Sequence, residues 1–207
     1  MQRIQTTEQL RAMLGDALPL TRNKIYDHVF ADAAAFIAKT PLIFVATSDR
    51  QGQPTVSPKG DAPGFVQVED EHTLLIPERP GNKLLHGFCN ILDTGQIGLI
   101  FVLPGTGETL RINGTAQLFH DPDTCAAMAA NGKDALLVTR VSVRECFFHC
   151  AKAFKRSHAW EPQAWSEPLK LSFGKQIAQK SAGNKIARKA LEMAIDQAVN
   201  LDYKKNL

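Results

Sequence analysis

The chain opens with apolar residues at helical spacing and continues with short apolar runs of strand length. Residues 23–39 place their apolar side chains on one stripe, which predicts a helix that ends at Thr40, the residue before Pro41. The stripe consists of Ile25, Val29, Phe30, Ala33, Phe36 and Ile37. Beyond Pro41 the apolar runs are separated by glycine, proline and polar residues, which is typical of an antiparallel meander.

Six or seven strands are predicted between residues 42 and 148. Apolar and polar positions alternate along 109–119 and 135–148, so one face of each of these strands is expected to be buried. The other strands are expected at 42–47, 55–59, 65–68, 73–77 and 96–103. Because helices do not alternate regularly with the strands, the order of elements favours an α+β fold around a small barrel over a doubly wound parallel sheet.

Two short helices are expected among the strands. One follows a loop at residues 79–83, and the other follows Asp121, which has the side chain of an N-cap. The apolar face of the first helix is predicted to consist of Leu84, Leu85, Phe88, Ile91 and Leu92.

Composition places the chain among ordinary globular proteins. Of its 207 residues, 44% are hydrophobic and 22% are charged. The longest strand-like apolar run, residues 97–103, is far shorter than the roughly 18 residues of a membrane span, so no membrane partner is expected. The first residues lack the apolar core of a secretory leader, and four cysteines are too few for a disulfide scaffold. These features predict a cytoplasmic protein.

Positive charge is concentrated near the end of the sequence. Residues 170–207 hold eight Lys/Arg and three Asp/Glu, a balance of +5, which leaves residues 1–169 at −2 within the net +3. Residues 173–207 also have a helical pattern, so we predict a domain at 1–169 and a helical extension at 170–207. The basic excess favours the solvated face of terminal helices and no nucleic-acid partner, with nucleic-acid binding through residues 170–207 as the alternative.

Several well-known sites are missing from the sequence. It has no G-x-G-x-x-G, no G-x-x-x-x-G-K-[ST] and no G-x-S-x-G, which argues against a Rossmann dinucleotide site, a Walker phosphate loop and the usual serine hydrolase. Cys146, His149 and Cys150 resemble half of a zinc site, but no second Cys/His pair lies at a matching spacing. We expect these thiols to be small apolar core residues, and no metal is predicted.

Basic and polar residues cluster beside two predicted strands. Ser57 and Lys59 lie two positions apart, so they share one face of their strand. Arg79, Asn82 and Lys83 follow the strand at 73–77 and open the next helix. A guanidinium, an ammonium and the free amides of a helix start are together the donors that a phosphate monoester needs. These residues predict an anionic ligand.

The order of three segments resembles the pyridoxamine 5'-phosphate oxidase-like FMN-binding proteins, in an uncharacterised branch of the split-barrel superfamily. The segments are T-V-S-P-K-G-D, L-L-I-P-E-R-P-G-N-K-L and I-G-L-I-F-V-L-P-G-T-G-E-T-L-R-I-N-G-T-A. The resemblance covers roughly residues 25–180, including H-C-A-K-A-F-K-R-S-H-A-W. It implies a split antiparallel β-barrel with flanking helices, which forms a homodimer and holds FMN in clefts between the subunits.

The resemblance also implies roles for individual residues. Ser57 and Lys59 match positions that face the flavin ring and ribityl chain. Asn82 and Lys83, with Arg79 beside them, match the phosphate-binding end. The remaining cofactor-binding positions are Arg111, which matches a residue that reaches the flavin from the partner subunit, and Lys152 and Trp160, which match the border of the cleft.

The implied function is an FMN-dependent oxidoreductase that acts on a small molecule by hydride transfer through the flavin N5, with NAD(P)H as a candidate donor. The sequence lacks the C-terminal R-L-x-x-R signature of true pyridoxamine-phosphate oxidases, which argues against vitamin B6 oxidation. No catalytic side chain stands out. One alternative is a non-catalytic FMN-binding or sensing module. Another is a haem-binding barrel with an axial ligand among His86, His120, His149 and His158.

Overall fold

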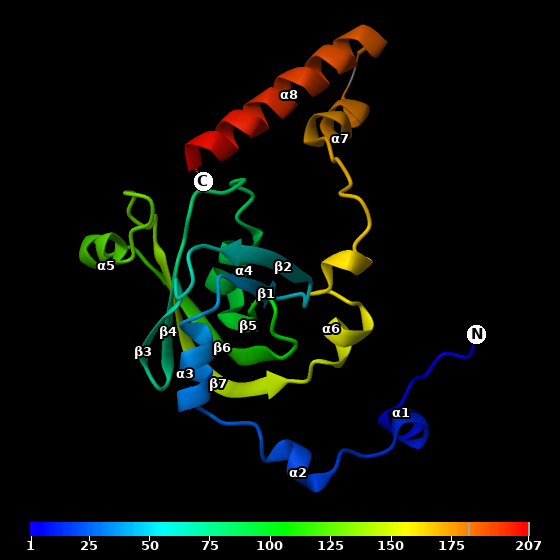
Figure 1. The fold of residues 1–207 in the computed structure, drawn as a ribbon, viewed down its shortest axis with the longest axis vertical. Coiled ribbons are helices and arrows are strands. Elements are labelled where there is room, and N and C mark those ends of the chain that lie inside the picture. The colour runs from blue at the N-terminus through cyan, green and yellow to red at the C-terminus, as the bar shows by residue number, and fades with distance from the viewer. Residues whose placement is uncertain (182, 207) are drawn as a thin grey trace. The chain divides into compact units, whose positions relative to one another are not determined.

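The computed structural model describes residues 1–181 and 183–206 and contains two compact units. The first unit comprises Met1–Trp160, and the second begins at Glu161. Figure 1 shows the strands gathered in the first unit and helices α7 and α8 in the second. The division predicted from the sequence, after residue 169, stays a prediction.

Seven antiparallel strands form a single sheet in the order β2-β1-β5-β6-β7-β4-β3. The strands are β1 (Leu42–Ser48), β2 (Pro54–Gly60), β3 (Gln67–Asp70), β4 (Thr73–Pro77), β5 (Gln96–Val102), β6 (Thr109–Phe119) and β7 (Val138–His149). The alternation predicted for 109–119 is confirmed, since Leu110 and Ile112 are fully buried and Arg111 between them is exposed.

The sheet is curled into an open barrel. Lys59, at the end of β2, and Asp61, directly after it, bond to the two residues that follow β4, although four strands lie between β2 and β4 in the sheet order. In the described chain no backbone pairing joins the two edge strands, β2 and β3. The predicted α+β fold, a split antiparallel β-barrel with flanking helices, is therefore confirmed. Its core includes Ile43, Leu74, Leu99, Phe101, Ile112 and Val141.

The helix predicted at residues 23–39 is too long. The helix α3 spans only Ala31–Ile37, where Ala33 and Ile37 are buried. The preceding segment is extended, because Tyr26 exchanges two backbone hydrogen bonds with Cys146 of β7, at 3.0 and 2.8 Å. Of its apolar residues, Val29 is buried in the core and Phe30 packs against the core, whereas Ile25 is exposed. Two short helices precede it, α1 (Thr7–Leu14) and α2 (Pro19–Arg22).

The apolar face predicted for the next helix is also wrong in part. The helix α4 spans His86–Thr94, so Leu84 and Leu85 lie in the loop before it, and both are exposed. Leu92 is exposed as well, whereas Asn90 and Ile91 are buried. The helix rests on the sheet through a polar contact, because the Asn90 amide donates to the Thr47 hydroxyl of β1 at 3.1 Å.

The strands β6 and β7 form a long hairpin with an irregularity in its middle. Their register shifts between Asn113 and Gly114. Gly114 is buried there, and a Cβ at this position would overlap the carbonyl oxygen of Ser142. The helix α5 (Pro122–Ala127) follows β6, and the Asp121 side chain accepts from the Thr124 N–H at 2.9 Å, which confirms the predicted N-cap. The helix α6 (Lys152–Arg156) follows β7.

The second unit contains a short 3-10 turn, η1 (Pro162–Ala164), and two helices, α7 (Phe173–Lys180) and α8 (Lys185–Asn206). Asp196 of α8 binds the start of α7: it accepts from the Ser172 hydroxyl at 2.6 Å and from the Gly174 N–H at 2.8 Å. These bonds hold the pKa of the Asp196 carboxyl below its usual value, the Ser172 hydroxyl having the larger effect. None of the described helices has the length and apolar character needed to cross a membrane.

Candidate functional site

Lys59 lies at the end of β2 in an ion pair with a buried carboxylate. Its ammonium contacts the carboxylate of Glu78, the residue directly after β4, and lies 4.9 Å from the centre of the Phe88 ring on α4. Glu78 is only 4% exposed, and its second carboxylate oxygen accepts from the Thr139 hydroxyl at 2.7 Å. The charge predicted from the sequence is present, but a carboxylate holds it in place.

Arg79 connects three segments of the first unit. Its Nε donates to Asp61 Oδ2 at 2.7 Å, and its Nη2 donates to the carbonyl oxygen of Met128, just after α5, at 2.8 Å. Its third nitrogen, Nη1, is buried and has no hydrogen-bond partner in the described structure. Because buried polar atoms are almost always paired, this atom marks a place where a ligand or water oxygen would fit.

The loop between Arg79 and α4 adopts an unusual backbone conformation. Lys83 and Leu85 both have φ values of 60°, in the left-handed region that residues other than glycine seldom adopt. The Asn82 side chain stabilises the turn by accepting from the Leu84 N–H at 3.0 Å. Lys83 is exposed, so its ammonium is available to a ligand. Strain of this kind is found often at binding sites.

Five of the predicted site residues lie on β2 or in the loop after β4, at the end of the barrel where these two segments are joined by ion pairs. Ser57 is exposed on β2, two positions before Lys59 and on the same face, because Val45 and Ile43, their respective partners on β1, are both buried. The loop residues Arg79, Asn82 and Lys83 follow β4. The Lys59–Glu78 and Arg79–Asp61 pairs join the two groups.

Arg111 lies on the opposite face of the sheet. Arg111 is paired with Ile100 on β5, which is paired in turn with Phe44 on β1, and both of these residues are exposed. Lys59, by contrast, is paired with the buried Ile43. Three strand spacings, about 14 Å along the sheet, separate β6 from β2. The structure therefore does not bring Arg111 to Lys59 within one chain.

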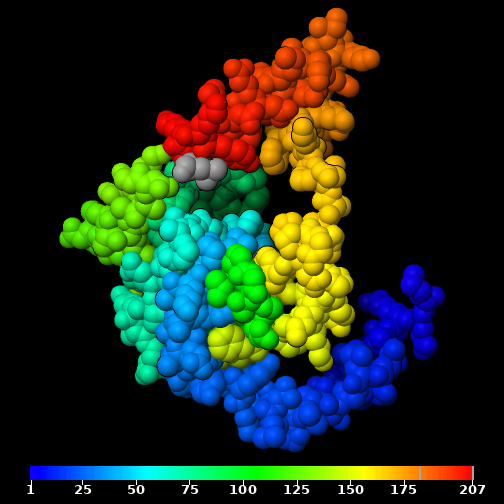
Figure 2. Space-filling view, in the orientation of Figure 1, coloured from blue at the N-terminus to red at the C-terminus, as the bar shows by residue number. Residues whose placement is uncertain are grey.

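Trp160 lies against the turn between β5 and β6, and Lys152 begins α6. The Trp160 Nε1 donates to the carbonyl oxygen of Thr106 at 2.8 Å, and its ring stacks on Phe154 with centroids 5.4 Å apart. Figure 2 shows the segment that contains α6 against this turn. These contacts give Trp160 a packing role, and Lys152 is exposed at the first position of α6. Their predicted roles in cofactor binding stay predictions.

Sequence reasoning missed the acidic partners of the site, Glu78 and Asp61. A signal was present in the sequence, since Lys59 and Asp61 are two positions apart on one segment and Glu78 and Arg79 are adjacent on another. Such opposite charges can pair when two strand ends meet. The two strands are not neighbours in the sheet, however, so local pattern does not show that they meet.

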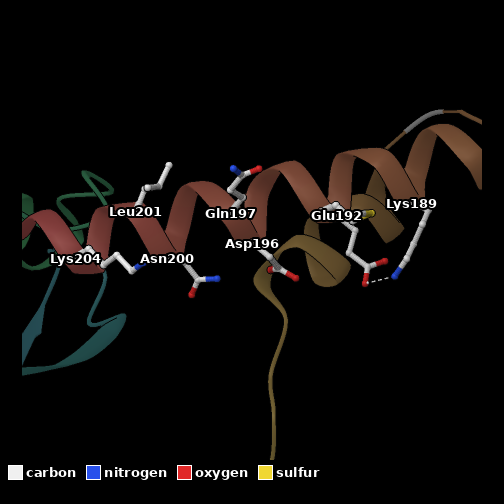
Figure 3. Close-up of a pocket in the computed structure, with 8 residues that line it drawn as sticks. Lys189, Glu192, Asp196, Gln197, Asn200, Leu201 and Lys204 are labelled. Atoms are coloured by element: carbon white, nitrogen blue, oxygen red, sulfur yellow. Dashed lines mark hydrogen bonds and ion pairs between the residues drawn. The ribbon is translucent and has the colours of Figure 1, made fainter.

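Two hollows lie away from this cluster. One, of about 690 Å³, lies on the outer face of the sheet between Ala46, Gly98, Asn113 and Glu145. The other, of about 560 Å³, lies along α8 in the second unit, where Figure 3 shows Lys189 paired with Glu192. Neither contains a predicted site residue. In residues 1–181 and 183–206, no three His, Cys, Asp or Glu side chains are grouped to hold a metal ion.

Comparison with known families identifies the first unit. Residues 30–150, more than half of the chain, match the sequence profile described as pyridoxamine 5'-phosphate oxidase. The chain belongs to the pyridoxamine 5'-phosphate oxidase family. The matched segment contains the whole sheet and α4, so the open barrel described above is the flavin-binding type of fold.

Solved structures similar to this family member cover little more than half of it. A HupZ variant from Group A Streptococcus is 23% identical with a TM-score of 0.47, covering 58% of this chain and 99% of its own. A putative pyridoxamine 5'-phosphate oxidase from Lactobacillus delbrueckii is 22% identical with a TM-score of 0.46, covering 59% and 95%. An FMN-binding protein from Syntrophomonas wolfei is 12% identical with a TM-score of 0.44, covering 56% and 82%. No curated protein sequence matches the chain.

Proposed function

We propose that this protein binds FMN at the subunit interface of a homodimer and acts as a flavin-dependent oxidoreductase on a small molecule. The observation that carries the proposal is the buried Nη1 of Arg79, which lies without a partner in the described residues at the start of the loop that leads into α4. A phosphate oxygen is a preferred partner of a guanidinium nitrogen.

The residues at this end of the barrel fit the phosphate of FMN. Lys83 offers an exposed ammonium, and the first N–H groups of α4 have no acceptor within the helix. Because donors at a helix start favour an anion, these groups and Arg79 would hold the phosphate together. Asn82 would act through the turn that it stabilises.

Ser57 and Lys59 would face the ring and the ribityl chain from the same face of β2. When bound, FMN supplies hydride transfer through its N5, with NAD(P)H as a candidate donor. The fixed ammonium of Lys59 would stabilise negative charge near it, and so favour the reduced form of the flavin.

A second copy of the chain would cover the outer face of the sheet and complete the site. Phe44, Val56 and Ile100 are exposed on this face, at 37, 64 and 42% of their surfaces. Arg111 lies in the same row as Phe44 and Ile100. A face with this much exposed apolar surface is typical of an interface. In a dimer formed through this face, Arg111 of each subunit would contact the flavin of the other. The four cysteines are free, which supports a cytoplasmic location.

The absorption spectrum of the purified protein, before and after addition of FMN, tests the cofactor. We expect a bound flavin, and a Lys83→Ala variant that binds FMN more weakly. Protein that binds no FMN when it is given in excess would refute the proposal. Stopped-flow reduction by NADH and NADPH then tests turnover, because a non-catalytic FMN carrier would be reduced no faster than free FMN.

The substitution Ile100→Asp tests the dimer. A charge at the centre of the outer face should give a folded monomer by light scattering and weaken FMN binding. Leu20→Asp in α2 is the matched control, since Leu20 is 79% exposed and lies outside the sheet. A dimer that survives Ile100→Asp with unchanged FMN affinity would remove this face from the site.

A further inference from the structure

We propose that Glu78 is a positioning residue that fixes the ammonium of Lys59 and limits the positive charge that Lys59 presents to the flavin. This inference rests on the proposed FMN site. It assigns a role to a carboxylate that the sequence pattern did not single out. In this proposal, the Lys59–Glu78 pair sets the reduction potential of bound FMN.

Glu78 is held rigidly on every side. Its backbone N–H donates to the carbonyl of Leu137 at 2.9 Å, and its own carbonyl accepts from the Leu136 N–H at 2.9 Å. One carboxylate oxygen accepts from the Thr139 hydroxyl and the other from Lys59. A side chain fixed at both its backbone and its carboxylate gives Lys59 one defined position.

The burial of the two partners differs. The side chain of Glu78 is 5% exposed, whereas that of Lys59 is 21% exposed and also contacts the face of the Phe88 ring. A carboxylate with so little exposure is poorly screened by water, so it offsets much of the field of the ammonium beside it. The open side of Lys59 is the side from which a ligand could reach it.

The sign of the effect follows from the charge of the flavin. Reduction makes the N1/O2 edge of the ring electron-rich, so a nearby cation binds the reduced form more tightly than the oxidised form. Removal of the Glu78 charge would leave Lys59 uncompensated and increase this difference. The potential of bound FMN should therefore rise when Glu78 becomes neutral.

The test compares Glu78→Gln with wild type in the full chain, by spectroelectrochemical titration of bound FMN. We expect the ratio of the dissociation constants of oxidised and reduced FMN to rise about tenfold, which is about 30 mV for a two-electron couple. Glu69→Gln is the matched control, because Glu69 pairs with Arg140 between β3 and β7, with both side chains about 40% exposed. It should leave the potential unchanged.

A second background shows whether Glu78 acts through Lys59. In Lys59→Met protein, the further change Glu78→Gln should shift the potential less than it does in the wild-type background, because no ammonium is left for Glu78 to hold in position. An equal shift in both backgrounds would overturn the inference, because Glu78 would then act through its own charge and not by positioning Lys59. The same shift with Glu69→Gln would also overturn it, because the effect would not be specific to Glu78.

If Glu78→Gln does not fold, Glu78→Asp replaces it. The shorter carboxylate cannot hold Lys59 and Thr139 together, so a smaller shift in the same direction is expected, and no shift would overturn the inference. Wild-type protein that binds no FMN would overturn the proposed function and this inference with it. Wild-type protein that binds FMN, with variants at Glu78 that leave its potential unchanged, would overturn this inference alone.

Discussion

Replacement of Arg79 by lysine should destabilise the first unit even though the charge is kept. Arg79 bonds through separate nitrogens to Asp61 and to the Met128 carbonyl, at 2.7 and 2.8 Å. Lysine has one nitrogen on a single stem, so it can keep the Asp61 pair but not both bonds. A hydrogen bond to a charged group contributes about 1.5–3 kcal/mol, and we take about 2 kcal/mol for the loss. For a unit of this size, that lowers the melting temperature by about 4–8 °C.

Differential scanning calorimetry of the protein without and with FMN measures both effects of Arg79→Lys. If Nη1 binds the phosphate, the variant also loses FMN affinity, about tenfold for each 1.4 kcal/mol. Arg140→Lys is the control, since its pair with Glu69 is half-exposed and worth at most about 1 kcal/mol. A melting temperature within about 1 °C of wild type would show that Arg79 does not hold the three segments together.

Two further predictions concern other parts of the chain. Gly114→Ala should cost about 1–3 kcal/mol in urea unfolding, because its Cβ would overlap the Ser142 carbonyl, whereas Gly81→Ala, with open space around it, should be neutral. The pKa of Asp196 is lowered in the folded chain, first by the Ser172 hydroxyl, so its contribution to stability is present above the unfolded value near 3.9 and is lost as pH falls through the folded value. The stability advantage of wild type over Asp196→Asn should therefore shrink as pH falls below the unfolded value, and an advantage that stays constant through that acid range would contradict this.

The sequence predicts the strands of this protein well because their burial is local. The alternation of Leu110 and Ile112 with Arg111 follows from the pleat of a single strand, so it can be read without knowledge of neighbours. The segment before α3 shows the limit. Its apolar spacing suits a helix, but the backbone bonds between Tyr26 and Cys146 come from a strand more than a hundred residues away.

In the candidate site too, local pattern predicts some residues, whereas others depend on contacts between distant segments. Ser57 and Lys59 share a face because they lie two positions apart on one strand. Following the paired residues from β2 through β1 and β5 to β6 places Arg111 on the other face. The partners Glu78 and Asp61 depend on the curl of the sheet, which brings the end of β2 to the residues after β4. Periodicity contains no information on that curl, so the sequence predicted the cations and not the acids beside them.

The charges of the site limit how one chain could hold a phosphate. Lys59 is matched by Glu78 and Arg79 by Asp61, so among the described residues Lys83 is the exposed cation of this cluster that has no carboxylate partner. A phosphate dianion would then depend on hydrogen-bond donors and on positive charge from elsewhere, such as Arg111 of a second copy. If that copy supplies the charge, FMN binding and dimerisation are linked: each strengthens the other by the same factor. The affinity for FMN should fall when the protein is diluted below its dimer dissociation constant, and Arg111→Ala should remove that dependence because the interface would no longer contribute charge to the site.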